Sequence, residues 1–233
     1  MKVEKYINTT EENISSRKHN ILIPICLGNK FFADKNIINK NVEKYISWAL
    51  KHTKDKVLVL VADKIQDTNY YVRNKHRTKV ASRRAVLKDG IELTNNIEEL
   101  SKKFSQDKWN RIDIIRWEEY EKEDPFYKHT RRLVYEEFKN NKNFRDGVLN
   151  AVKTSITDRE FTEEEYLKLC NYVLDEFSLA YSGTVYKKNY YGIYIYPETD
   201  SVVRFIEKIQ GGKIFQELHN MLPEEKMALI ILN

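Results

Sequence analysis

The sequence places a thiol, a phenol and a carboxyl group in patterns that suit acyl transfer. Cys26 lies in an apolar run, ILIPICL at residues 21–27, while Tyr172 and Glu176 are four residues apart and would share one face of a helix. A thiol can carry an acyl group as a covalent intermediate. A phenol and a carboxylate together can hold an ammonium group or relay a proton. Tyr196 ends another apolar run and could bring a third polar group to the same pocket.

The position of Cys26 at the end of a strand strengthens this interpretation. Ligands of open α/β sheets bind beyond the carboxyl ends of the strands, and Gly28 would let the backbone turn sharply there. A structural explanation exists as well, because a lone cysteine on an apolar strand is most often an inert core residue. The Tyr172–Glu176 spacing is also common on helices, so neither feature alone assigns a reaction.

A second feature is a basic segment at residues 70–88, which contains no acidic residue until Asp89. If the segment is one helix, four of its cations form a stripe, and Val72, Val80 and Leu87 face the core. The stripe consists of Arg73, Arg77, Arg84 and Lys88, and the other cations are Lys75, Lys79 and Arg83. Solvated helix faces usually interleave charges of both signs, because like pairs repel. A polyphosphate partner would relieve that repulsion, so we predict contact with the backbone of a folded RNA.

The motifs that are missing restrict the chemistry. The chain has 7 glycines, and none forms GxxxxGK[ST] or GxGxxG, the loops that cradle nucleotide phosphates. A bond-forming enzyme without such a loop would use a substrate that arrives already activated. The 5 histidines show no metal-ligand spacing, and we predict no metal.

Composition favours a globular cytoplasmic protein. Hydrophobic residues make up 41% of the 233 residues, yet no apolar run is long enough to span a bilayer, and the polar start of the sequence shows no secretory signal. Cys26 and Cys170 lie far apart without a CxxC pattern, which argues against a disulfide framework or a zinc site. The net charge of +5 is a mild bias toward anionic partners.

These residues need a scaffold, and the hydrophobic pattern predicts an α/β fold. Five apolar runs are predicted strands: residues 21–27, 57–62, 112–117, 193–196 and 228–232. Helices are predicted at residues 41–51, across the basic segment, from Asp124-Pro125 to residue 138, and from a Thr162/Glu165 capping box to residue 177. Alternating strands and helices indicate a mainly parallel sheet of about five strands flanked by helices, with the helical segment 126–180 packed at one end. No linker interrupts the chain, so residues 1–233 are predicted to form a single domain.

The motifs taken in order resemble those of the cyclodipeptide synthase family. The family has a hydrophobic strand ending in Ser-x-Gly-Asn, and here the strand ends Cys26-Leu27-Gly28-Asn29. Its second signature, Tyr-x-x-x-Glu-x-Pro, appears as Tyr172 to Ser178. Asp124-Pro125-Phe126-Tyr127, the basic segment and Tyr196 keep the same order along the chain.

The resemblance implies a Rossmann-like domain similar to the catalytic domain of class I aminoacyl-tRNA synthetases, without ATP chemistry and without a cofactor. It implies a ping-pong reaction that uses two aminoacyl-tRNAs per turnover and forms a diketopiperazine through an aminoacyl-enzyme. The roles carried over by position are nucleophile for Cys26, α-amino binding for Tyr172 and Glu176, proton transfer for Tyr196, positioning for Gly28, Asn29 and Tyr127, and tRNA binding for the basic segment.

Two positions depart from the family pattern, and two others point to different subfamilies. Cys26 stands where the family has serine; a thioester is readily attacked by an amine, but the larger sulfur could misplace the acyl group. Ser178 replaces the motif's proline, and Pro197 and Asn29 point to different subfamilies.

The residues expected to line the substrate pocket are Leu22, Pro24, Leu60, Leu179, Tyr194 and Glu118. Of these, Glu118 would favour a polar or basic substrate side chain.

Two other functions fit parts of the sequence. A non-catalytic tRNA- or RNA-binding module on the same fold would bind RNA in a salt-sensitive manner without forming an acyl-enzyme. A nucleotide-using transferase with an unrecognised phosphate site would bind ATP, which the scarcity of glycines disfavours.

Overall fold

The computed structural model describes residues 2–27, 35–74, 78–156, 159–181, 183–197, 200–222 and 227–232, with backbone only for residues 35–39. Within these ranges no helix is both long enough and apolar enough to cross a membrane.

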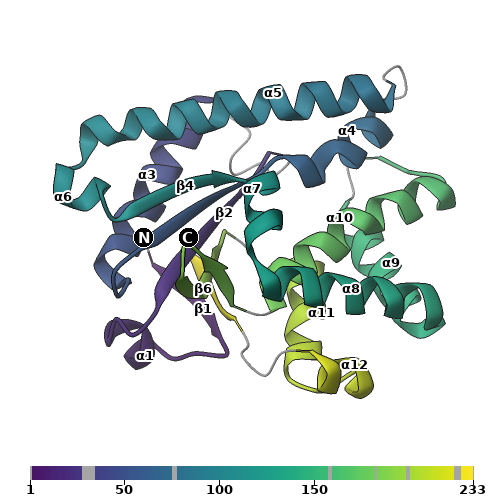
Figure 1. Ribbon diagram of the computed structural model, residues 1–233. Helices are drawn as coiled ribbons and strands as arrows, with labels where there is room; N and C mark the ends of the chain where they lie inside the picture. The colour runs from purple at the N-terminus through teal and green to yellow at the C-terminus, as the bar shows by residue number, and fades with distance from the viewer. Residues whose placement is uncertain are drawn as a thin grey trace.

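A twisted seven-stranded sheet forms the centre of the described chain (Figure 1). Its path runs β1-β7-β6-β2-β3-β4, and β5 pairs with β6 outside that path. The strands are β1 (Val3–Ile7), β2 (Asn20–Cys26), β3 (Val57–Ala62), β4 (Ile112–Arg116), β5 (Thr184–Tyr186), β6 (Asn189–Tyr196) and β7 (Ala228–Leu232). Five of them, β7, β6, β2, β3 and β4, run parallel to one another, whereas β1 is antiparallel to β7 and β5 is antiparallel to β6.

Alternate residues of the parallel strands point to opposite faces of the sheet and build two hydrophobic cores. On β2, Leu22 and Cys26 belong to one core, and Ile21, Ile23 and Ile25 belong to the other. We call the face that carries Cys26, the nucleophile expected from the sequence, the catalytic face and the other the rear face. Both faces are covered, so the central strands read as nearly continuous apolar runs, as parallel strands do.

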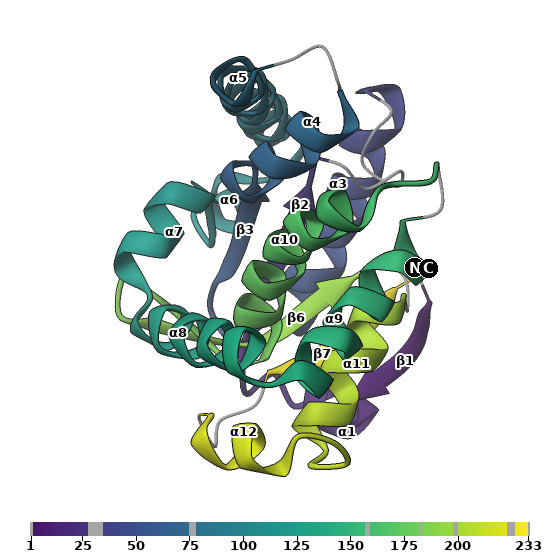
Figure 2. The same cartoon turned by 90° about the vertical axis from the view of Figure 1, so that its right-hand side faces the viewer.

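Helices form a layer on each face. On the rear face, α3 (Lys35–His52), α1 (Glu11–Ser15) and the second half of α5 (Lys79–Glu98) contribute to the core. On the catalytic face, α10 (Glu163–Tyr181) crosses the sheet, with α8 (Pro125–Asn140), α9 (Lys142–Ser155) and α11 (Ser201–Gln210) beside it (Figure 2). The remaining elements are η1 (Lys64–Gln66), α4 (Asp67–Arg73), η2 (Glu99–Lys103), α6 (Gln106–Trp109), α7 (Trp117–Glu123) and α12 (Gln216–Met221).

The five predicted strands are confirmed, and two strands were missed. The β1 segment, VEKYI, lies at the sheet edge with only Ile7 fully buried, so it lacks a strong apolar pattern. The hairpin from β5 to β6 turns at Lys187 and Lys188, whose φ angles are 46° and 66°. Such left-handed turns usually carry Gly or Asn, and two lysines gave no turn signal.

The prediction of one continuous basic helix was wrong. The helix α4 ends at Arg73 because Asn74 adopts an extended conformation, with φ −121° and ψ 90°. A new helix, α5, starts after Thr78, whose hydroxyl accepts a hydrogen bond from the Ala81 amide. The stripe predicted to include both Arg73 and the α5 cations therefore does not exist. Val80, predicted to face the core, is 60% exposed, whereas Ser82 and Val86 face inward.

Both predicted helix starts on the catalytic face are confirmed. Asp124 accepts hydrogen bonds from the amides of Phe126 and Tyr127 at the start of α8. At the start of α10, the Thr162 hydroxyl accepts from the Glu165 amide at 3.2 Å. The Glu165 carboxylate in turn accepts from the Thr162 amide at 2.8 Å. This reciprocal pair satisfies two backbone donors that the helix cannot satisfy itself.

Replacing Thr162 with alanine removes one half of this pair, and we expect the free energy of unfolding to fall by about 1 kcal/mol. Urea denaturation followed by circular dichroism measures the change. The matched control is Thr162→Ser, which keeps the hydroxyl and should retain most of the stability; equal losses in both variants would contradict the capping role.

Candidate active site

Cys26 is the last residue of β2, in the middle of the parallel sheet. It pairs in register with Ala62 of β3 and is 4% exposed. Leu22 and Pro24 precede it on the same strand at a spacing of two, so the three side chains point to the catalytic face. The structure thus places the thiol at the carboxyl end of a central strand, as the sequence predicted.

The helix α10 brings Tyr172 and Glu176 to this thiol. The Tyr172 hydroxyl donates a hydrogen bond to Cys26 Sγ at 3.6 Å. One turn further along, Glu176 is buried, with 4% of its surface exposed. Tyr172 and Cys26, 146 positions apart in the sequence, therefore meet in the fold. A Tyr-x-x-x-Glu pattern that arose by chance would not be expected to lie against the thiol.

Three phenols surround the buried carboxyl of Glu176. Tyr172, Tyr196 and Tyr194 all hydrogen-bond to it, and these bonds favour its charged form. Burial has a larger opposite effect, and the nearby charge of Asp200 adds to it, so the pKa of Glu176 rises from 4.5 to about 7. The carboxyl group is therefore close to half-ionised at neutral pH and can both accept and release a proton.

The thiol of Cys26 is a weak acid in this environment. Burial raises its pKa well above the ordinary value, the charge of Glu176 raises it further, and the hydrogen bond from Tyr172 opposes both. Cys26 is consequently a thiol at neutral pH and must lose its proton during any attack. Since Tyr172 hydrogen-bonds to both Cys26 and Glu176, it connects the two groups between which that proton could move.

Asp200 belongs to this electrostatic group, and the sequence reasoning missed it. Its carboxylate caps α11 by accepting a hydrogen bond from the Val203 amide at 2.8 Å. Its charge raises the pKa of both Glu176 and Cys26. An Asp before the amphipathic stretch SVVRFIEKI is a recognisable N-cap signal, but nothing in the sequence shows that this cap adjoins Glu176.

Five of the six predicted pocket residues are buried on or beside the catalytic face. Leu22, Leu60, Leu179 and Tyr194 belong to the same core as Cys26, and Pro24 is buried on β2 opposite Leu60. Glu118 differs. It lies in the first turn of α7, its side chain is 56% exposed, and it forms an ion pair with Lys122. Lys122 also holds the pKa of Glu118 below its ordinary value, so the structure does not group Glu118 with the buried pocket residues.

The three predicted positioning residues have different outcomes. Gly28 and Asn29 lie outside the described residues. Tyr127 is buried, and its ring packs edge-on against Trp117 with a centroid distance of 5.5 Å. The groups that most affect its pKa after burial are Asp175 and Arg131, not Glu176. The structure thus places Tyr127 in the packing between α7 and α8.

Ser178, which stands where the family motif has proline, continues the helix. Its hydroxyl donates to the Leu174 carbonyl at 2.7 Å, and α10 runs on to Tyr181. A proline could not supply the backbone donor at this position. Serine in place of proline therefore keeps a backbone N–H group and adds a side-chain hydrogen bond two residues beyond Glu176.

The basic surface is carried by α5 and the end of α4. Lys79, Arg83, Arg84 and Lys88 are exposed within the first ten residues of α5. No salt bridge joins these four side chains to a carboxylate in the described part of the chain. Arg73 is exposed at the end of α4, and Lys75 and Arg77 lie outside the described residues.

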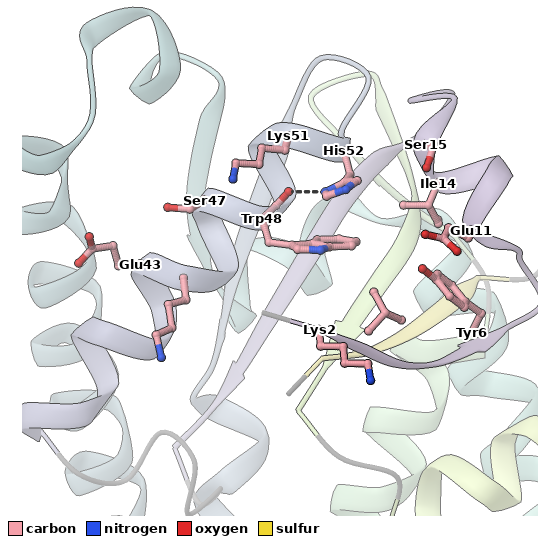
Figure 3. Close-up of a pocket in the computed structure, with 12 residues that line it drawn as sticks. Lys2, Tyr6, Glu11, Ile14, Ser15, Glu43, Ser47, Trp48, Lys51 and His52 are labelled. Atoms are coloured by element: carbon pink, nitrogen blue, oxygen red, sulfur yellow. Dashed lines mark hydrogen bonds between the residues drawn. The ribbon is translucent and has the colours of Figure 1, made fainter.

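A cavity of about 660 Å³ lies elsewhere, between β1, α1 and α3 (Figure 3). Its wall includes Tyr6 and Ile14 on one side and Trp48 stacked on His52 on the other. The apolar members of this wall belong to the rear core, so the cavity is separated from Cys26 by the sheet. Among the described residues no group of His, Cys, Asp and Glu side chains is arranged to hold a metal ion.

Comparisons with known proteins agree with the motif order. The sequence model of one family, described as Cyclodipeptide synthase, matches residues 1–181. The comparison with curated protein sequences gave no match. Among solved structures, a cyclodipeptide synthase from Staphylococcus haemolyticus superposes with a TM-score of 0.71 at 18% identity, covering 98% of each chain.

Two further structures are informative. A Mycobacterium tuberculosis protein, whose structure was described as demonstrating that cyclodipeptide synthetases are related to type I tRNA synthetases, matches with a TM-score of 0.70 and 12% identity over 100% of this chain and 96% of its own. The cyclodipeptide synthase from Candidatus Glomeribacter gigasporarum, solved bound to Phe-tRNAPhe, matches with a TM-score of 0.53 and 14% identity over 91% of this chain and 87% of its own. At these identities the matches show a common fold.

The raised pKa of Glu176 makes stability depend on pH. Between pH 4.5 and pH 7 the folded chain keeps a proton that the unfolded chain has released, so stability falls as pH rises through this window. Relative to Glu176→Gln, which carries no charge, the unaltered chain should lose about 3 kcal/mol between these limits. Urea denaturation of both proteins at pH 4.5 and pH 7.5 tests the difference. The control, Glu164→Gln, removes an exposed carboxylate paired with Lys168 on the same helix and should show no such loss. A pH-independent difference for Glu176 would contradict the raised pKa.

Proposed function

The chain belongs to the cyclodipeptide synthase family, and on that premise we propose that it joins two aminoacyl groups from aminoacyl-tRNAs into a cyclic dipeptide through a thioester on Cys26. The observation that carries the proposal is the hydrogen bond from Tyr172 to the Cys26 thiol, with the buried Glu176 bonded to the same phenol. A thiol buried only for packing would not need a hydrogen-bond partner from a distant helix.

In the first step, Cys26 Sγ attacks the ester carbonyl of one aminoacyl-tRNA. The S–C bond forms, the bond from the carbonyl carbon to the ribose oxygen breaks, and the thiol proton ends on that oxygen. The ester is already activated, so ATP is not consumed. Because burial keeps the thiol protonated, the reaction needs a proton path, and the contact with Tyr172 supports one.

In the second step, the α-amine of the enzyme-bound aminoacyl group attacks the ester of the second aminoacyl-tRNA, forming the peptide bond and releasing the second tRNA. The new terminal amine then attacks the thioester, which closes the six-membered ring and restores the Cys26 thiol. Each attack needs a neutral amine. We propose that Glu176, with a pKa of about 7, binds the α-ammonium group together with Tyr172 and takes its proton. Tyr196, bonded to the same carboxyl, would assist that transfer.

The exposed cations of α5 support tRNA binding by the same chain. Lys79, Arg83, Arg84 and Lys88 bring four positive charges onto one short stretch of helix, and backbone phosphates would neutralise them. A reaction on aminoacyl-tRNA with a free cysteine fits the cytoplasm, where thiols remain reduced.

The nucleophile is tested by expressing the unaltered chain, Cys26→Ala and Cys26→Ser in bacteria, and by measuring cyclic dipeptides in the medium with mass spectrometry. We expect product from the unaltered chain and a loss of at least about 10³-fold with alanine. Purified enzyme mixed with aminoacyl-tRNA should gain the mass of one aminoacyl group, which neutral hydroxylamine should remove because a thioester is labile to it. Product from the serine variant alone would show that sulfur disables the site. If no version makes product yet tRNA binding persists, the RNA-binding alternative replaces this proposal.

The tRNA surface is tested by the double variant Arg83→Glu/Arg84→Glu, in which two attractive charges become repulsive. Filter binding at several salt concentrations should show at least a tenfold weaker affinity and a shallower salt dependence, by about one unit of the log–log slope for each lost phosphate contact. Lys142→Glu is the matched control on α9, where the lysine pairs with Asp146 and lies far from α5 in the sequence. An equal weakening by the control would contradict a specific role for α5.

A further inference from the structure

A partly buried ion pair stands at the carboxyl ends of two neighbouring strands. Asp63 follows β3, Arg116 ends β4, and the guanidinium donates to Asp63 Oδ2 from both Nε, at 2.7 Å, and Nη2. The Asp63 side chain is only 1% exposed. Its second oxygen, Oδ1, accepts from the Lys64 amide at 2.7 Å, so both oxygens of this carboxylate have partners. Neither residue belongs to the catalytic group around Cys26.

The same pair also holds the helix α5. Arg116 Nη2 donates a hydrogen bond to the Leu87 carbonyl of α5 at 3.1 Å. Gly90, one turn further on, lies directly against the Asp63 side chain; an added Cβ would come within 2.6 Å of the Asp63 Cβ. At Gly90 the backbone of α5 therefore lies against Asp63, at a distance that a residue with a side chain could not reach. Figure 1 shows α5 running alongside β4, the strand that ends at Arg116.

The position of this contact relates the basic surface to the thiol. Ala62, the residue before Asp63, is the register partner of Cys26. Leu87, the residue bound by Arg116, lies between Arg84 and Lys88 in the exposed basic part of α5. A short path thus connects the strand beside Cys26 to the helix that carries the cations. It consists of the chain from Ala62 to Asp63, the hydrogen bonds from Arg116 to Asp63, and the hydrogen bond from Arg116 to the α5 backbone.

We infer that the Asp63–Arg116 pair is a positioning element for the acyl transfer: it fixes α5 relative to Cys26, so that a tRNA held by the α5 cations presents its aminoacyl ester at the thiol. The inference rests on the proposed function. It assigns to these two residues a role in orienting the macromolecular substrate, separate from binding it. Displacements of about an ångström in a reacting pair can cost two orders of magnitude in rate, so a small shift of α5 would be visible in the kinetics.

The physical basis is the geometry of the guanidinium. Its planar fork can bond Asp63 and the Leu87 carbonyl at the same time, whereas a lysine offers one compact ammonium group on a flexible chain. Arg116→Lys should therefore preserve the charge balance beside Asp63 and lose the link to α5. Gly90→Ala tests the same contact from the other side, because it leaves both charges in place and pushes α5 away from Asp63.

The experiment compares two acyl donors with one purified enzyme. The first is the aminoacyl-tRNA whose amino acid appears in the cyclic product; the second is the cyanomethyl ester of the same amino acid, which reaches the thiol without a tRNA. Acylation of Cys26 is followed by intact mass after rapid quenching, and tRNA affinity is measured separately by filter binding. The matched control is Glu121→Gln, which removes the Lys64–Glu121 ion pair between the same two strand-end segments without touching α5.

For Arg116→Lys and for Gly90→Ala we expect acylation at saturating aminoacyl-tRNA to slow at least tenfold, acylation by the small ester to stay within twofold, and tRNA affinity to stay within threefold, because every α5 cation remains. Glu121→Gln should leave all three unchanged. If one of the two variants fails to fold, the other gives the result.

Equal slowing with both donors would mean that the pair only supports the site's structure and would overturn the inference. Unchanged rates with both donors would overturn it as well. If the unaltered chain is acylated by neither donor, the proposed function itself fails and the inference falls with it, and this outcome is distinct from the other two.

Discussion

A carboxyl group buried in an apolar core needs hydrogen-bond donors, and the arrangement around Glu176 follows from that need. The hydrogen-bond partners of Glu176 are the phenols of Tyr172, Tyr194 and Tyr196, which come from α10 and β6. Meeting them requires α10 to lie across the sheet face onto which β6 and β2 direct alternate side chains. The same constraint brings Cys26 within reach of Tyr172. The phenols around Glu176 therefore meet a structural requirement, since an unpaired buried carboxylate would destabilise the fold.

The sequence was a good guide wherever one local signal determined the outcome. The five parallel strands were predicted because strands covered on both faces are continuously apolar, and the starts of α8 and α10 were predicted because Asp124 and Thr162 are strong capping residues. The meeting of Cys26 with Tyr172 and Glu176 was predicted through the resemblance to a family. The spacing of residues showed on which face of its own helix or strand each side chain lies. It could not show that these faces pack against one another.

The predictions that failed concerned features that depend on backbone conformation or on tertiary packing, and not on one local signal. The break between α4 and α5 depends on the extended backbone of Asn74, which the run of helix-forming cations concealed. The proximity of Asp200 to Glu176, and of Asp63 to Arg116, arises from tertiary packing between segments far apart in sequence. Glu118 was assigned to the pocket because it follows a strand, yet the first turn of α7 directs it to solvent, where Lys122 pairs with it.

The strand order has a consequence for the synthesis of the chain. The first strand, β1, pairs only with β7, which is made more than two hundred residues later, and β7 also supplies one neighbour of β6. While the polypeptide emerges from a ribosome, β2 and β3 can already associate, but β6 stays a sheet edge until β7 arrives. Tyr194 and Tyr196 lie on β6, so these two phenols around Glu176 are fixed in place only after β7 has been made. Long-range pairings of this kind slow folding. Folding of this part of the chain thus has to wait until α11, α12 and β7 have all left the ribosome.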